Sequence, residues 1–209
     1  MTPITRHALG TTALLCTALL AAGCGKNPAN SAAGQGAASS SGPAAPATSA
    51  PASAGAAGCA SAGLTAKVDT AQAGGAAGST YVPIDFTNTS GSPCTLFGYP
   101  GVSFVTGPTG GQLGEAASRN PAATATTVTL APGGVAHATL QVAEAGNYSA
   151  SACTPVTAHW LRIIPPNQPT PIFARYTVQA CSAKLPSGVG SQLAIYVVRP
   201  GPGKAGQGP

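Results

Sequence analysis

The chain has 209 residues, a length that allows one or two domains. Nine Lys or Arg residues against four Asp or Glu give a formal net charge of +5, and many of the 28 glycines and 20 prolines fall in two stretches, residues 25–58 and 200–209. The cations are scattered singly along the chain, without an interleaved aromatic residue. Because nucleic-acid binding needs a basic patch or stripe, the composition argues against a nucleic-acid partner.

Residues 1–23 have the organisation of an export signal. Arg6 precedes an apolar run over residues 8–22, and its 15 residues are fewer than the ~20 that span a bilayer as a helix. The run ends in small residues before Cys24 and resembles the bacterial lipobox, except that Ala21 stands where leucine is usual. We expect a lipid on the Cys24 thiol and anchoring at the extracellular face of the cell membrane. Ordinary signal cleavage and secretion is the alternative.

Residues 24–58 are predicted to be the lipidated cysteine followed by a disordered linker. From Gly25 onward the segment consists mainly of Ala, Gly, Ser and Pro, and it has no aromatic residue and no Leu, Ile or Val. Such a segment cannot bury enough apolar surface to offset the entropy of ordering, and as a flexible coil it would reach about 30–35 Å. Residues 200–209 are predicted to be a disordered tail.

Residues 59–199 are long enough to fold as one domain, and they contain four cysteines. An even number of cysteines in an exported chain predicts disulfides. Of the three connectivities, we expect Cys59–Cys94 and Cys153–Cys181, because these pairs are nearest in sequence and each closes a loop around one hairpin-sized unit. No Cys-x-x-Cys motif is present, so a zinc site is the weaker alternative.

The same residues show the period-two alternation of half-buried strands, for example at Leu64–Val68 and at residues 82–86. Eight to nine short strands separated by turns predict an all-β fold, a single Ig-like antiparallel β-sandwich with two disulfides, and a barrel is the alternative. Pro83 predicts an edge strand or a bulge. Residues 126–130 and 135–142 are expected to form a hairpin, and Trp160 is expected in the core.

Residues 94–102 read CTLFGYPGV, after the run FTNTS at 86–90 and before LAPGG at 130–134. Together with one early and two late cysteines, this order resembles the actinobacterial domain of unknown function 4232 over residues 59–198. The resemblance implies a secreted or lipid-anchored protein and brings no known activity, cofactor or catalytic residue.

We expect structural roles in turns and packing for several residues of these motifs. Gly98 and Gly101 are expected at positive φ, and Asn88 is expected to cap a turn through its side chain. Tyr99, which Pro100 holds extended, either packs into a tight corner or presents a binding surface on a rigid loop.

Catalytic and metal-binding candidates are few. Asp69 and Asp85 are the only plausible carboxylate pair for an enzyme acting on envelope glycans, but both fall on outward strand positions where solvated charges are the rule. His137 and His159 could serve a metal-binding chaperone, yet no acid lies at ligand spacing. We therefore expect no catalysis, cofactor or metal. The expected function is a binding or surface-interaction module of the cell envelope, with Tyr99 as candidate binding residue and an envelope protein or cell-wall polymer as partner.

Overall fold

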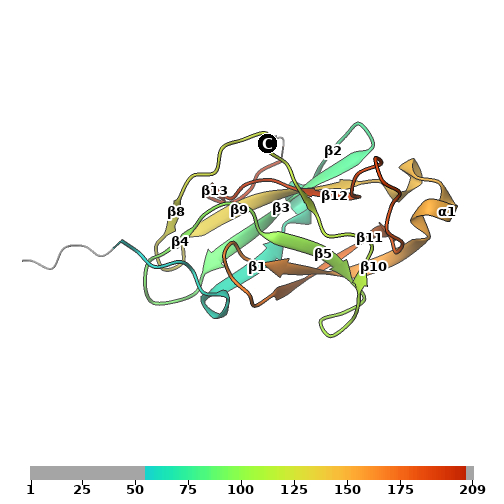
Figure 1. Ribbon diagram of the computed structural model, residues 1–209. Coiled ribbons are helices and arrows are strands. Elements are labelled where there is room, and N and C mark those ends of the chain that lie inside the picture. Colours follow the sequence, from blue (N-terminus) through green and yellow to red (C-terminus); the bar gives the residue numbers. More distant parts are fainter. Residues whose placement is uncertain (1–54, 206–209) are drawn as a thin grey trace, which may run out of the picture. The chain divides into compact units, whose positions relative to one another are not determined.

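The computed structural model describes residues 55–205, which form two sheets packed face to face (Figure 1). The expected Cys24 anchor, the signal and most of the linker lie outside these residues. The larger sheet has the order β1 (Leu64–Val68), β3 (Ser79–Asn88), β9 (Val135–Ala143), β12 (Leu193–Ile195) and β7 (Ser118–Arg119), with β2 (Gly74–Ala76) also on β3 and β13 (Arg199–Pro200) on β9. The four-stranded sheet has the order β11 (Ile172–Cys181), β10 (Pro155–Ile164), β5 (Gly101–Val105) and β6 (Gln112–Leu113).

A third, two-stranded sheet pairs β4 (Cys94–Leu96) with β8 (Val128–Leu130). The helices are short: η1 (Ser61–Gly63), η2 (Thr70–Gln72), η3 (Ala145–Asn147) and α1 (Ala150–Cys153). Every strand pairing within the three sheets is antiparallel except that of β12 with β7. The predicted all-β sandwich with two disulfides is confirmed.

The alternation in the sequence decides which face of each strand is buried. Val82, Ile84 and Phe86 of β3 are 0% exposed, and they share one core with Leu161 and Ile163 of β10 in the facing sheet. Burying each of these side chains contributes about 1.5–3 kcal/mol, so the contact between the two sheets is the main source of stability.

Each disulfide includes a cysteine of β4 or of α1, two elements that lie toward opposite ends of the sandwich (Figure 1). Cys59–Cys94 ties the start of the domain to β4, and Cys153–Cys181 ties α1 to the end of β11. Both pairings are those predicted from the spacing. With sequence separations of 35 and 28, each contributes about 3–4 kcal/mol in the chain-entropy model.

Gln192 holds the two sheets together near the α1 end. Its side-chain oxygen accepts a hydrogen bond of 2.8 Å from the N–H of Cys181, and its amide nitrogen donates to the carbonyls of Ala143 and Gln179, each at 3.0 Å. Both N–H groups of this buried amide and one of the two acceptor positions of its oxygen thereby bind backbone from both sheets, as a buried polar side chain requires.

Pro83 lies in the interior strand β3. The prediction of an edge strand or a bulge at this position was wrong. The carbonyl of Pro83 accepts a hydrogen bond of 2.9 Å from Asp69, and in an antiparallel strand the N and O of one residue face the same side. On that side β1 has ended with the pair Val68–Ile84, and β2 begins only opposite Tyr81. The missing N–H therefore faces a gap between two strands and removes no ladder hydrogen bond.

The predicted hairpin of β8 with β9 is wrong, because β8 pairs with β4. The turn at residues 131–134 forms, but it carries the chain from the small sheet into the large one. Fully buried Asn88 holds this crossing: its amide donates to the carbonyls of Leu130 and Ser92 at 3.1 and 2.9 Å. Its side-chain oxygen accepts from the N–H of Ser90 at 3.0 Å, which confirms the predicted turn cap.

Trp160 lies on the outer face of the four-stranded sheet, not in the core as predicted. The register of β10 against β11 is irregular between Ala158 and Trp160, where two steps along β10 face three steps along β11. Across this irregularity Ala158 and Leu161 both point into the core, while Trp160 is half-buried on the other side.

Candidate functional site

The C-terminal segment, residues 199–205, crosses the outer face of the large sheet, whereas the sequence predicts a disordered tail from Pro200. Arg199 and Pro200 pair with β9, and the N–H of Gly201 donates to the carbonyl of Val135 over 2.9 Å. Further along, the N–H of Gly203 donates to the Asp85 carboxylate at 2.9 Å. Residues 200–205 are thus part of the folded domain.

Glycine is required where the segment lies closest to the sheet. A Cβ on Gly203 would lie 2.2 Å from the Cβ of Pro83, which is closer than two non-bonded carbon atoms can approach. Gly201 adopts φ +79°, a conformation that side chains other than glycine rarely tolerate. These two glycines let the backbone lie flat on β3 and β9.

A row of ionisable side chains runs across four strands beneath and beside this segment. Lys67 of β1 pairs with Asp85 of β3, Asp85 pairs with His137 of β9, and His137 pairs with Arg199 of β13. Directly paired residues in an antiparallel sheet point to the same face, so all four side chains lie on the outer face of the large sheet.

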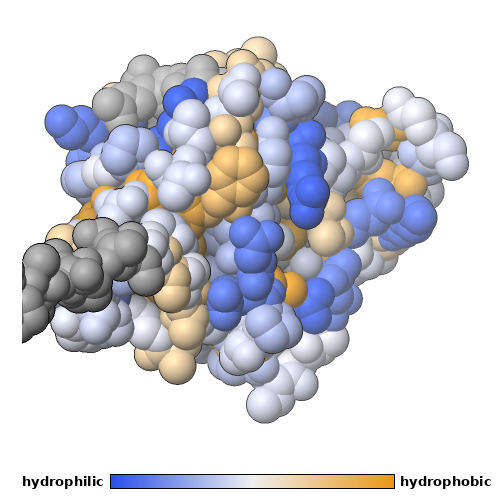
Figure 2. Space-filling view, turned by 60° about the vertical axis from the view of Figure 1, so that its left-hand side comes forward, coloured by the Kyte–Doolittle hydropathy of each residue, from blue (hydrophilic) through white to orange (hydrophobic). Residues whose placement is uncertain are grey.

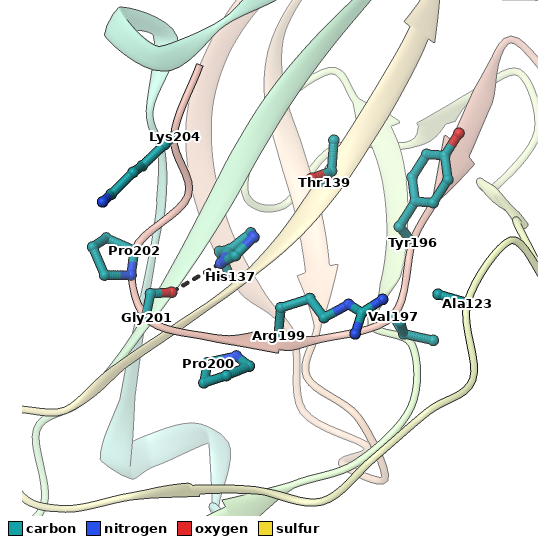
Figure 3. A pocket seen from close by; sticks show the side chains of 10 residues that line it. All are labelled: Ala123, His137, Thr139, Tyr196, Val197, Arg199, Pro200, Gly201, Pro202 and Lys204. Atoms are coloured by element: carbon teal, nitrogen blue, oxygen red, sulfur yellow. Dashed lines mark hydrogen bonds between the residues drawn. The ribbon is translucent and has the colours of Figure 1, made fainter. Parts of the chain in front are cut away.

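A pocket of about 540 Å³ opens beside the C-terminal segment (Figure 3). Buried His137, Thr139 and Tyr196 lie along the sheet side of the pocket, and Arg199 and Lys204 belong to the crossing segment. Figure 3 shows Arg199 between His137 and Tyr196, while Lys204 lies at the other end, beyond Pro202.

His137 is fixed by the segment itself. Its Nδ1 lies 2.9 Å from the carbonyl oxygen of Gly201. Because a carbonyl can only accept, Nδ1 carries the proton, and Nε2 is an acceptor in the neutral ring and a donor in the charged ring. The pocket therefore contains an imidazole whose orientation is set before any ligand arrives.

Tyr196 contributes a hydroxyl whose ionisation is suppressed. Burial raises the pKa of Tyr196, and the nearby Tyr81 raises it further, while a side-chain hydrogen bond with Asn120 lowers it. The hydroxyl donates to the side-chain oxygen of Gln141 at 3.4 Å. Tyr196 is therefore a neutral hydrogen-bonding group at physiological pH, not a nucleophile or base.

The pocket carries positive charge without a balancing acid. Arg199 and Lys204 are exposed, and none of the lining residues is Asp or Glu. Between residues 55 and 205 the one ion pair joins Lys184 to Glu115 at 3.3 Å, so neither pocket cation is neutralised by a carboxylate there. The arrangement is suited to bind a carboxylate or phosphate group.

The two predicted carboxylates do not line this pocket. Asp85 lies under the C-terminal segment, where its carboxylate accepts from Gly203, and Asp69 stands at the start of η2 without a side-chain capping hydrogen bond.

The two predicted histidines lie on different sheets. His137 is on β9, whereas His159 is on β10, where its Nδ1 lies 3.2 Å from the hydroxyl of Thr177. Within the described part of the chain, no three His, Cys, Asp or Glu side chains gather as a metal site would require.

Tyr99 occupies the corner between β4 and β5. It packs against the core, and its hydroxyl donates to the carbonyl of Asn120 at 3.1 Å; the guanidinium carbon of Arg119 lies 5.6 Å from the ring centroid. Gly98 has φ +94° as predicted, whereas Gly101 is an extended residue of β5 and the prediction of positive φ there was wrong. These contacts favour the packed corner, and a binding role for Tyr99 stays a prediction.

Comparison with known protein families gives a match to the described domain. The family model described as Domain of unknown function (DUF4232) matches residues 59–196. The matched range contains both disulfides and the His137, Thr139 and Tyr196 side of the pocket, and it ends before Arg199 and Lys204. No curated protein and no solved structure matches the chain.

Proposed function

Because the chain belongs to the family described as Domain of unknown function (DUF4232), and that description names no activity, we propose a function from the residues themselves. The protein is a non-catalytic binding module of the cell envelope, attached to the membrane by a lipid on Cys24. Its pocket takes a carboxylate or phosphate group of an envelope protein or cell-wall polymer. The two disulfides support an extracytoplasmic location, because such bonds form and persist in oxidising compartments. The longest helix between residues 55 and 205 is α1, with four residues, so no helix in this range could cross a bilayer.

The observation that carries the proposal is a preformed pocket whose cations, Arg199 and Lys204, form no ion pair with a carboxylate of residues 55–205. Arg199 offers a planar fork of donors that matches a carboxylate or phosphate, and Lys204 adds a second charge at the other end. His137 and Tyr196 form a fixed wall that needs little rearrangement, since both are buried and already donate hydrogen bonds, to Gly201 and to Gln141 respectively.

Two features support binding over catalysis. General acid–base chemistry needs two groups that converge on one reacting bond, and the pocket lining contains no carboxylate to act with His137. Burial also raises the pKa of Tyr196, which removes a candidate base. What remains are hydrogen-bond donors and fixed positive charge, which hold an anion without transforming it.

The test is a titration of the isotopically labelled full chain, observed by amide NMR. Phosphate and acetate are the probes, and methyl glucoside is the neutral control. We expect saturable shifts at Gly201 and Tyr196 with the anions only. Arg199→Gln should weaken anion binding about tenfold, the value of one charge-assisted hydrogen bond. Lys67→Gln removes the same charge from the far end of the same cross-strand row and should leave affinity unchanged. Shifts that do not saturate, or equal losses in both variants, would contradict the proposal.

A further inference from the structure

The outer face of the four-stranded sheet carries two arginines and two aromatic residues in alternation. Trp160 of β10 pairs with Arg175 of β11, and Arg162 pairs with Phe173. Residues two apart on a strand share a face, so these four side chains occupy the corners of one square on the solvent side. We call this set the arginine–aromatic face.

The guanidinium of Arg175 is oriented by Trp160. Its central carbon lies 4.4 Å from the centroid of the indole ring, a stacked cation–π contact. The register irregularity before Trp160 makes the contact available, because Ala158 and Leu161 are both buried and Trp160 is left on the outer face. Arg175 itself is exposed, so the edge of its fork faces solvent.

Arg162 is held in place in a different way. It reaches from β10 across β5 to β6, where its guanidinium donates to the side-chain oxygen of Gln112 at 2.6 Å. Beneath it lies its strand partner Ser103, only 3% exposed although on the outer face, and the Nε of Arg162 is itself buried without a hydrogen-bond partner. Both guanidiniums are therefore fixed by neighbouring side chains, which lowers the entropy that a ligand must remove on binding.

No acid balances these charges on the sheet. The strands β5, β6, β10 and β11 contain no Asp or Glu, and the ion pair of Lys184 with Glu115 involves neither arginine. Two oriented guanidiniums are suited to bind anionic groups. The half-buried rings of Trp160 and Phe173 beside them offer apolar contact of the kind that sugar rings use.

We propose that the arginine–aromatic face is a second binding site, and that its ligand is an anionic polysaccharide of the envelope. Carboxylate or phosphate groups of the polymer pair with Arg162 and Arg175, while sugar rings pack on Phe173 and the exposed edge of Trp160. The site lies on a different sheet from the C-terminal pocket. The inference rests on the proposed location at the envelope but not on the pocket.

Trp160 is the sole tryptophan of the chain, so its fluorescence reports directly on this face. The experiment titrates the full chain with polygalacturonate, with neutral dextran of the same length, with vesicles containing an anionic phospholipid and with single-stranded DNA. We expect a saturable change in emission with polygalacturonate and none with dextran. Polysaccharide binding should be tighter, per anionic group, than binding of vesicles or DNA.

Three variants make the test specific. Arg175→Gln should weaken polygalacturonate binding about tenfold, and Arg175→Lys should lose part of it, because a lysine keeps the charge but not the planar fork. Lys67→Gln removes one charge from the other sheet and should change nothing.

An unchanged melting temperature in Arg175→Gln shows that the fold is intact, and Arg162→Gln provides a second variant if it is not. No change in emission, equal losses in the Arg175 and Lys67 variants, or a preference for vesicles or DNA would each overturn the proposal. Arg199→Gln separates the two sites, since it should affect only the pocket.

Discussion

The carboxylate of Asp85 accepts a hydrogen bond of 2.9 Å from the backbone N–H of Gly203, although the two residues lie 118 positions apart. This bond, together with the contact of His137 with Gly201, holds the C-terminal segment on the large sheet and so creates the pocket beside it. The site thus depends on the last part of the chain as much as on the sheet.

Gly203→Ala should displace the segment, because the new methyl group would overlap Pro83. Overpacking of this kind costs about 1–3 kcal/mol, and we expect a melting temperature lower by several degrees with faster amide exchange at residues 199–205. Lys204→Ala is the neighbouring control, since this side chain is exposed and should leave the melting temperature unchanged. Equal exchange in the wild type and in Gly203→Ala would mean that the segment is not held by this contact.

The strands and disulfides could be predicted because their signals are local. The alternation at Val82, Ile84 and Phe86 is a property of one strand, and it is correct there whatever the strand pairs with. Each disulfide, Cys59–Cys94 and Cys153–Cys181, joins successive cysteines of the domain, so the shorter loop length alone favoured these pairs.

The pocket could not be predicted, because it arises from pairing between distant residues. Nothing local in the Pro- and Gly-rich residues 199–205 distinguishes a strand from a tail, because the pairing of Arg199 with His137 and the packing of Gly203 over Pro83 join residues far apart in the sequence. The prediction that Trp160 lies in the core was wrong for a related reason. A single register irregularity reverses the face on which a residue lies, and strand periodicity does not reveal such irregularities.

Tyr99→Ala distinguishes the two interpretations of Tyr99, a residue packed into a tight corner or a residue that binds a partner. The structure gives this side chain a core contact, a hydrogen bond to Asn120 and a stacked Arg119, so we expect a loss of about 3 kcal/mol in the free energy of unfolding and a clearly lower melting temperature. Tyr99→Phe keeps the ring and removes only the hydroxyl, which should cost about 1 kcal/mol. A normal melt for Tyr99→Ala combined with loss of envelope binding would instead make Tyr99 a binding anchor.

Cys24→Ser tests the anchor. The thiol is the group expected to receive the lipid, so the variant should no longer be labelled by a radioactive fatty acid and should leave the membrane fraction or keep its signal peptide. Cys16→Ser is the matched control, because Cys16 lies inside the apolar run that cleavage removes. If the wild type and Cys24→Ser are labelled equally, the chain is not anchored through this residue.

Alkaline pH should weaken the fold through its buried tyrosines. Burial raises the pKa of Tyr176 and of Tyr196 above the ordinary value of 10.0, so these hydroxyls keep their protons in the folded state at a pH where the unfolded chain has lost them. By linkage, stability falls with pH wherever the folded state binds more protons. Their contribution is therefore fully present below about pH 10 and is lost as pH rises through the raised pKa values.

Urea unfolding between pH 8 and pH 11.5, with tyrosinate absorbance followed in parallel, measures this effect. Tyr196→Phe removes one of the titrating groups and should make the decline shallower without abolishing it, because Tyr176 remains. Tyr81→Phe removes the neighbouring charge that raises the pKa of Tyr196, so it should move the tyrosinate transition of Tyr196 to lower pH. A decline of the same steepness in the wild type and in Tyr196→Phe would show that Tyr196 ionises equally in the folded and unfolded chain, and that burial does not suppress the ionisation of its hydroxyl.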